Sequence, residues 1–311
     1  MHGPSNNRVE FEMPLNERNT ILNELNPPFV VYEPERQTSP LVFCSPHSGR
    51  IYPQILLERS QLDPRSLRKS EDCYVDQLFN QAPAAGAPLI AANFPRAYLD
   101  VNREPFELDP ELFDEPLPDF ANPRTMRVIG GLGTIPRVVA EAEEIYSKPL
   151  SLAVALERIE RLYRPFHQTL DGLLQRTRQQ FGYAVLIDCH SMPSASVTFP
   201  AAARPEFILG DRFGGSCDFR ITRTTREAIS HLKYQVQLNR PYAGGFITEH
   251  YGRPSEDLHA LQIEINRGLY LNEATQERSR RFAGFKNDID ALVFELTLSI
   301  PAIFENRLAA E

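Results

Sequence analysis

The chain has 311 residues, of which 42% are hydrophobic and 24% are charged, and its formal net charge at pH 7 is −8. This composition is typical of a globular protein, and we expect a single domain over residues 1–311 with an N-terminal extension at 1–25. The acidic balance, without a lysine- and arginine-rich stripe, argues against a nucleic-acid partner. No apolar stretch reaches the roughly 20 residues of a membrane span, and the polar N-terminus lacks the apolar region of a secretory signal. We therefore expect a cytoplasmic protein with no membrane partner.

Apolar runs and helical patterns alternate along the chain, as is typical of α/β proteins. In chain order, the pattern predicts strands at 29–32 and 40–44, a helix at 63–80, strands at 89–93 and 96–101, an irregular loop or lid at 104–135, a helical region at 141–180 broken at Pro149 and Pro165, strands at 185–187, 207–209, 234–237 and 261–265, and a helix at 275–298. These elements predict an α/β fold in which helices cover both faces of a mixed sheet of about eight strands.

Four apolar runs lead into, or contain, side chains that can ligate a metal, bind an anion or transfer a proton. The pairs are 41–43 with His47, 97–99 with Arg103, 184–187 with His190, and 261–265 with Glu264. Open α/β sheets bind their ligands beyond the carboxyl ends of the strands. We therefore expect the four side chains to converge on one crevice, as a metallohydrolase with a carboxylate-binding pocket requires.

His47 and His190 follow two strands at matching positions, which favours a shared metal ion. A histidine in a turn is more often a surface residue, but two at equivalent strand ends strengthen the interpretation. Catalytic zinc commonly takes three protein ligands and leaves a position for water. Asp188 can orient one of the rings from behind. The residues alone do not decide which of three acids is the third ligand: Glu71, Asp72 or Asp76. The alternative for at least one of them is a solvated position at the start of a helix.

Glu264 interrupts an apolar strand, where an unpaired carboxylate is costly to bury unless its pKa rises. A raised pKa suits a general base, and the alternative is a structural ion pair with Arg267 or Arg103. Arg103 follows a strand together with Asn102, and the two can grip a substrate carboxylate. The alternative for Arg103 is a position on the protein surface, where most arginines lie.

Two glycine-rich segments and four cysteines complete the candidate chemistry. Residues 130–134 lack the lysine and spacing of a phosphate-binding loop. In residues 241–252, Gly244 and Gly245 allow a ligand to approach the backbone and His250 carries a polar group, although a flexible hairpin tip would show the same pattern. The cysteines form no Cys-x-x-Cys pair, so packing is the simpler interpretation, and a Cys189 nucleophile is the alternative. The four are Cys44, Cys73, Cys189 and Cys217.

In their order and spacing, six segments resemble the N-formylglutamate amidohydrolase family. They are residues 45–49, 70–76, 100–103, 188–191, 244–252 and 261–264. The family is distantly similar to the zinc carboxypeptidases, which implies a three-layer sandwich with a phosphorylase/hydrolase-like sheet. One departure is that zinc carboxypeptidases place a glutamate three residues after the first histidine, where this chain has Arg50.

The resemblance also implies roles for individual residues. It implies that Zn²⁺, or another divalent metal, binds His47, Asp72 and His190, and that Glu264 is the general base. It implies that Asn102 and Arg103 grip a substrate carboxylate, and we expect Gly244, Gly245, Thr248 and His250 of the matching segment to contribute to substrate binding. The expected reaction is hydrolysis of N-formyl-L-glutamate, a small acidic molecule, to formate and L-glutamate, as in histidine catabolism.

Three alternatives stay open at this point. A related hydrolase could act on a different N-acyl amino acid or a peptide-like amide with the same machinery. A metal-free cysteine hydrolase would use Cys189 or Cys217. A non-catalytic protein could bind the same small molecule without turnover.

Overall fold

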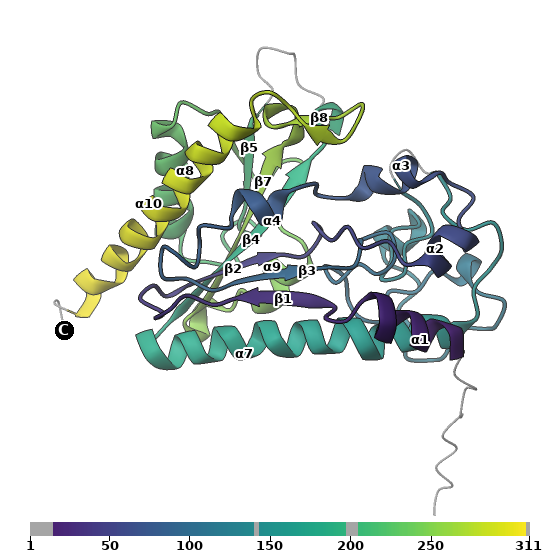
Figure 1. The fold of residues 1–311 in the computed structure, drawn as a ribbon. Helices are drawn as coiled ribbons and strands as arrows, with labels where there is room; N and C mark the ends of the chain where they lie inside the picture. The colour runs from purple at the N-terminus through teal and green to yellow at the C-terminus, as the bar shows by residue number, and fades with distance from the viewer. Residues whose placement is uncertain (1–14, 140–142, 197–204, 309–311) are drawn as a thin grey trace, which may run out of the picture.

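The computed structural model describes residues 15–139, 143–196 and 205–308, which form a mixed seven-stranded sheet between helices (Figure 1). The strands of this sheet are β1 Phe29–Tyr32, β2 Leu41–Ser45, β3 Leu89–Ala92, β4 Ala184–Met192, β5 Phe207–Gly210, β6 Val236–Leu238 and β7 Leu258–Asn266. A small ribbon pairs β8 Leu271–Asn272 with β9 Glu277–Arg278. The helices are α1 Leu15–Glu24, α2 Gln54–Arg59, α3 Pro64–Leu67, α4 Val75–Leu78, α5 Met126–Ile129, α6 Leu152–Arg158, α7 Arg164–Phe181, α8 Phe219–His231, α9 Phe246–Tyr251 and α10 Phe282–Leu308.

The strand order is β1-β3-β2-β4-β7-β5-β6. The central strands β3, β2, β4 and β7 are parallel, whereas β1 and β5 join the sheet antiparallel to β3 and β7. β4 and β7 have nine residues each, all buried, which explains their nearly continuous apolar sequences. The predicted α/β fold with a mixed sheet is confirmed, with seven strands in place of about eight.

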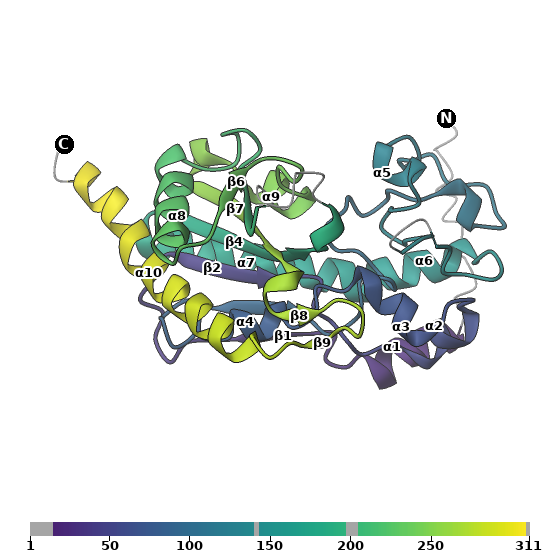
Figure 2. The same ribbon diagram turned by 90° about the horizontal axis from the view of Figure 1, so that it is seen from above.

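Successive residues of the central strands pack into different cores, because side chains alternate between the two faces of a sheet. Leu186 of β4 belongs to the core beneath α6, α7 and α9, and its neighbour Ile187 belongs to the core beneath α4, α8 and α10. Figures 1 and 2 show α7 along one face and α8 with α10 on the other. The result is a three-layer arrangement of helices, sheet and helices.

The predicted strand at 96–101 is wrong. The backbone N–H groups of Tyr98 and Leu99 both bond to the carbonyl of Pro95, so this segment is a turn. Its apolar side chains are nevertheless buried, since Ala97, Tyr98 and Leu99 are at most 1% exposed. The apolar run reflects a buried loop at the end of the sheet.

The predicted helix at 63–80 is also wrong, because it is interrupted where the site requires an irregular backbone. The structure has α3, a 3₁₀ turn at Arg68–Ser70, a non-helical stretch and then α4. Tyr74 lies in the left-handed region at φ 63° immediately before α4, which a continuous helix does not permit. Asp72 therefore lies outside any helix, and it shares no helix face with Asp76 of α4.

Other boundaries also differ from the prediction. The C-terminal helix begins at Phe282, after β9, and not at 275. The predicted helical region at 141–180 begins partly outside the described residues, and its helices are α6, a π turn at Ile159–Tyr163 and α7. The segment at 104–135 is irregular apart from a 3₁₀ turn at Pro110–Leu112 and α5, as expected. Within the described ranges, no helix combines the length and apolarity needed to cross a membrane.

Candidate metal centre and active site

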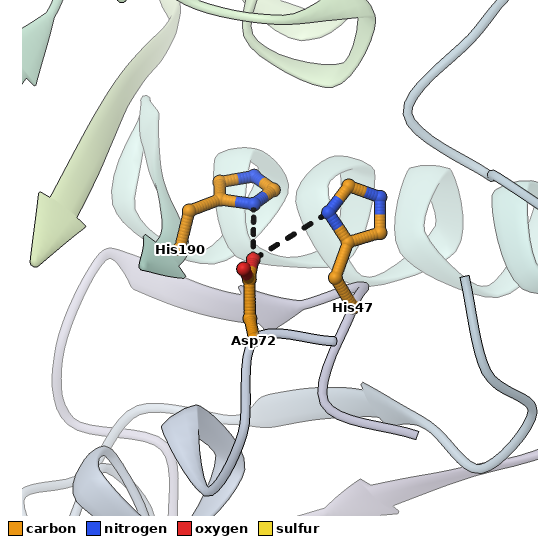
Figure 3. A group of neighbouring side chains, drawn as sticks. All are labelled: His47, Asp72 and His190. Carbon is orange, nitrogen blue, oxygen red and sulfur yellow. Dashed lines mark hydrogen bonds and ion pairs between the residues drawn. The ribbon is translucent and has the colours of Figure 1, made fainter. Parts of the chain in front are cut away.

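His47, Asp72 and His190 lie together at the carboxyl end of the central strands (Figure 3). Their ligand atoms all lie within 4.8 Å of one another, and the three residues are buried. His190 belongs to β4, whereas His47 lies in the loop after β2. Asp72 joins them because its backbone N–H donates to the carbonyl of His47 at 2.9 Å. The predicted convergence of the two histidines is confirmed, and Asp72 is the acidic residue at the cluster.

A second aspartate lies behind each histidine ring. Nε2 of His47 donates to Oδ1 of Asp100 at 2.8 Å, and Nε2 of His190 donates to Oδ1 of Asp188 at 2.9 Å. Each Nδ1 consequently faces Oδ2 of Asp72, at 3.5 Å from His47 and 3.0 Å from His190. Carboxylates that bind the remote nitrogen of a ligating histidine fix its tautomer and its ring orientation.

The two oxygens of Asp72 have different surroundings. Oδ1 accepts from Nη2 of Arg267 at 2.9 Å and from the Ser191 hydroxyl at 3.2 Å, which leaves Oδ2 toward the histidines. Burial alone would raise the pKa of Asp72, but its hydrogen bond with His190 and the nearby His47 and Arg267 hold it well below its ordinary value. Asp72 is therefore an anion at the centre of the cluster.

The donor set fits a divalent cation. Nδ1 of His47 is a buried nitrogen without a hydrogen-bond partner among the described residues, although it points at Oδ2 of Asp72. A nitrogen in this position needs either a proton with an acceptor or a metal ion. Two imidazoles and one carboxylate are also the three-ligand set that leaves a coordination position open in catalytic zinc sites. The three residues can thus hold a metal.

Glu264 lies beside this cluster, because residues in register on neighbouring parallel strands share a face of the sheet. Glu264 of β7 is paired in register with His190 of β4. Burial raises the pKa of Glu264 to about 7, although the neighbouring His190 lowers it. The alternative of a structural ion pair finds no support in the described part of the chain, where Arg267 pairs with Asp72 and Arg103 with Asp100. The carboxylate of Glu264 instead accepts a hydrogen bond from Nε2 of Gln262, at 2.9 Å.

A cavity of about 650 Å³ opens onto the cluster. Asp72, His190 and Glu264 line it, together with Asn102 and Arg103. The four strand-end side chains predicted from the sequence therefore meet in one place, with three of them on the cavity wall and His47 buried beside the ring of His190.

Asn102 and Arg103 have extensive contacts within the protein. Oδ1 of Asn102 accepts from the Ile247 N–H at 2.7 Å, and its Nδ2 lies 3.3 Å from Nε2 of His190. Arg103 donates from Nε to the carbonyl of Leu132, from Nη1 to the carbonyl of Asn102, and from Nη2 to Asp100. A guanidinium has five N–H groups, so two of those on Arg103 have no partner in the ranges that the structure describes and can meet a ligand.

The glycine-rich segment at 241–252 is the entrance to α9 and not a hairpin. Gly244 and Gly245 line the cavity, and a Cβ on Gly245 would lie 2.4 Å from Nδ2 of Asn102. Thr248 is buried and donates to Oδ2 of Asp188 at 3.0 Å, so it supports the cluster from behind. His250 is exposed, stacks on Phe246, and is not part of the cavity wall.

The thiols do not have the environment of nucleophiles. All four cysteines are buried and free. Burial raises the pKa of Cys189 well above its ordinary value and that of Cys217 to about 12, whereas reactive cysteines have lowered pKa values. These surroundings favour packing and argue against the cysteine hydrolase.

Asp100 and Arg96 also contribute to this site, in roles that the sequence pattern did not predict. Asp100 receives hydrogen bonds from His47, from the Asn102 N–H and from Nε of Arg96. The i, i+4 spacing of Arg96 and Asp100 was a possible signal, but it only becomes informative once the segment is known to be a turn. Burial would raise the pKa of Asp100, yet Arg103, Arg96 and His47 lower it well below its usual range.

Comparison with known proteins identifies relatives over most of the chain. The profile of the family described as N-formylglutamate amidohydrolase matches residues 39–271. An N-formylglutamate deformylase of Pseudomonas putida is 32% identical over 75% of this chain and 82% of its own length. A second N-formylglutamate deformylase, from Pseudomonas aeruginosa, is 28% identical over 88% of this chain and 97% of its own.

Solved structures give a consistent result. The crystal structure of N-formylglutamate amidohydrolase from Ralstonia eutropha JMP134 superposes with a TM-score of 0.82 and 34% identity, covering 90% of this chain and 99% of that one. The structure of the gene product Atu2144 from Agrobacterium tumefaciens has a TM-score of 0.59 and 19% identity, over 88% of this chain and 95% of that one. The second similarity concerns the fold alone.

Proposed function

Because this chain belongs to the N-formylglutamate amidohydrolase family, and is thus a hydrolase of C–N amide bonds, we propose that it is metal-dependent and converts N-formyl-L-glutamate and water into formate and L-glutamate. The observation that carries the metal dependence is the orientation of the two histidines. Asp100 and Asp188 take up the Nε2 atoms, and both Nδ1 atoms face one carboxylate oxygen of Asp72.

In this proposal Nδ1 of His47, Oδ2 of Asp72 and Nδ1 of His190 hold a zinc ion, although another divalent metal would fit the same donors. A zinc ion bound there would supply a Lewis acid for the formyl oxygen and would lower the pKa of a water molecule. Arg267 and Ser191 hold Asp72 in place through its other oxygen.

Glu264 acts as the general base. Its raised pKa, at about 7, suits a group that takes a proton near neutral pH and gives it up again. The Glu264 carboxylate removes the proton of the attacking water and returns it to the nitrogen of the leaving glutamate as the C–N bond breaks. Gln262 holds the carboxylate in position from the same strand.

Arg103 binds one carboxylate of the substrate with its two remaining N–H groups, and Asn102 shapes the wall beside it. Gly244 and Gly245 bring the backbone to the cavity wall, where a Cβ would crowd Thr248 at the first position and Asn102 at the second. Such positioning supplies a large part of the rate enhancement in enzymes that hold their reactants in a reactive geometry. A cytoplasmic location and a part in histidine catabolism are expectations from the family resemblance.

The test combines metal analysis of the purified protein with an assay of formate release from N-formyl-L-glutamate, before and after chelation. We expect a stoichiometric divalent metal, loss of activity on chelation and recovery when the metal is returned. A comparison of formyl, acetyl and succinyl derivatives of glutamate and aspartate identifies the acyl specificity. Full activity in metal-depleted protein would contradict the proposal.

A variant separates the role of Glu264 from that of the metal ligands. Glu264→Gln should abolish turnover while metal content stays unchanged, because the amide cannot accept the proton. Retained activity in this variant would remove Glu264 from the mechanism.

A further inference from the structure

The cavity is cationic although the whole chain is acidic. Among the residues that the structure describes, two carboxylates face it, those of Asp72 and Glu264, while the net charge of the protein is −8. Six cationic side chains line the same wall: Lys69, Arg96, Arg103, Arg127, Arg212 and Arg267. A cavity with this excess of positive charge attracts anions. The proposed substrate carries two carboxylates, and Arg103 accounts for only one of them.

Several of these cations are already neutralised or lie at the reacting centre. Arg267 is paired with Asp72 and Lys69 with Glu143. Arg96 donates from Nε to Asp100, the carboxylate that also orients His47, so its charge belongs to the metal centre. None of the three is a separate receptor for a distal carboxylate.

Arg212 is also occupied. Its Nη2 lies 2.7 Å from Oε1 of Glu249, and its Nη1 donates to the carbonyl of Gly244 at 3.3 Å. Glu249 therefore neutralises Arg212 at the rim of the cavity.

Arg127 differs from the others. Its guanidinium makes one hydrogen bond within the described residues, a long one of 3.4 Å from Nη1 to the carbonyl of Asn102. Its place on the wall is nevertheless well defined, because Thr125 caps α5 and the next residue, Val128, is buried. Arg127 is thus a half-buried cation that is held at the cavity and has most of its N–H groups without a partner in the described part of the chain.

Arg103 and Arg127 lie next to each other. Nη1 of Arg103 donates at 2.7 Å to the same carbonyl, that of Asn102, which Arg127 also approaches. Burial lowers the pKa of Arg103 to about 10, with Arg96 and Arg127 acting in the same direction and Asp100 against it. Two adjacent guanidinium groups repel one another, and a ligand with two carboxylates relieves that repulsion.

We propose that Arg127 binds the side-chain carboxylate of an acidic N-acyl amino acid and so makes the enzyme selective for acidic substrates. The inference rests on the proposed function and adds to it the residue that selects the amino acid. The two carboxylates of glutamate are joined through a short, flexible chain, which lets one reach Arg103 while the other reaches Arg127. Aspartate, with one methylene fewer, should fit this pair of arginines less well.

The test compares kcat/KM for N-formyl-L-glutamate with that for N-formyl-L-glutamine, whose side chain is neutral and nearly isosteric. Arg127→Met removes the charge but keeps the length of the side chain. A hydrogen-bonded charge of this kind is typically worth a 10- to 100-fold effect, so kcat/KM for N-formyl-L-glutamate should fall by about that factor, mainly through KM. The value for N-formyl-L-glutamine should change by less than about threefold.

Arg212→Met is the matched control, since Arg212 lines the same cavity but is paired with Glu249. It should leave the preference for glutamate over glutamine nearly intact. Thermal melting of both variants verifies that they fold. The inference is overturned if Arg127→Met lowers kcat/KM for N-formyl-L-glutamate and for N-formyl-L-glutamine by the same factor. It is also overturned if Arg212→Met is the variant that loses the preference for glutamate over glutamine.

Calorimetric binding of L-glutamate tests the same contact without turnover. The wild-type protein should bind L-glutamate more tightly than the Arg127→Met variant does. Equal affinities of the two proteins for L-glutamate would overturn the inference. If wild type binds glutamate in an Arg127-dependent way but hydrolyses none of the N-formyl compounds, the proposed function fails while the assignment of Arg127 holds.

Discussion

Oδ1 of Asp188 lies 2.9 Å from Nε2 of His190, two residues further along β4. Residues i and i+2 of a strand face the same side of the sheet, so the strand itself delivers both partners. The contact leaves Nδ1 of His190 toward Asp72, at 3.0 Å. The orientation of a candidate metal ligand is thus encoded within three consecutive residues.

Asp188→Asn should weaken metal binding by about 10- to 100-fold, because an amide is a poorer acceptor and makes the ring less basic. The amide can still bond to His190 and Thr248, so we expect the fold to be kept. Metal affinity measured by competition with a chromogenic chelator checks the prediction. Asp76→Asn is the control, since Asp76 pairs with the exposed Arg50 away from the cluster, and equal losses in the two variants would contradict it.

Metal binding should release about one proton from the apoprotein at pH 7, because the ligand nitrogens must be deprotonated. Burial alone would lower the pKa of His190, but the carboxylates of Asp188 and Asp72 raise it well above its ordinary value. Calorimetric titration with Zn²⁺ in buffers of different ionisation enthalpy measures the protons released. A binding enthalpy that does not depend on the buffer would show that His190 is already neutral in the apoprotein.

His167 should make stability fall as the pH is lowered from about 6.5 toward 4. Burial lowers the pKa of His167 to about 4 from the ordinary 6.5. Between these values the unfolded chain binds a proton that the folded protein does not, so acid favours unfolding. His167 forms hydrogen bonds with the carbonyl of Val101 and with the Tyr251 hydroxyl. The titrating ring therefore contacts the residue that precedes Asn102 in the chain.

The free energy of unfolding in urea, measured at pH 7 and pH 5, checks this prediction. His167→Gln removes the titrating group and should lose less stability between the two pH values than wild type does. His231→Gln, at an exposed position of α8, is the control and should behave like wild type. A His167→Gln variant with the wild-type pH dependence would refute the assignment.

Gly245→Ala should damage the site through packing. The added Cβ would lie 2.4 Å from Nδ2 of Asn102, a side chain already fixed by the Ile247 N–H. We expect a loss of about 1–3 kcal/mol in stability, as for other overpacked positions, together with reduced formate release. Gly172→Ala is the control, because nothing lies within 4 Å of the Cβ position on α7, and it should stabilise the protein by about 0.5–1 kcal/mol. Full activity in Gly245→Ala would show that Asn102 can move without consequence.

The amino-acid sequence alone was enough to predict the α/β class and the strands β4 and β7 that carry the site. The central strands β4 and β7 are buried on both faces, and a strand buried on both faces needs apolar residues at nearly every position. The same reasoning located His47, His190 and Glu264, because polar side chains that interrupt or end such runs have few reasons to be there other than function. The family resemblance then singled out Asp72 among three neighbouring acids.

Only the tertiary structure decided how these residues meet. Asp72 comes to the cluster through a break between α3 and α4 and a backbone bond to His47, and the helical pattern of 63–80 conceals that break. The apolar run before Asp100 reads as a strand but is a buried turn, since burial and not extended conformation selects those residues. Arg127 is an ordinary surface arginine by sequence, and its proximity to Arg103 arises from a contact between segments 25 residues apart. Local patterns record burial and propensity, whereas the pairing of distant charges depends on how loops fold over the ends of the sheet.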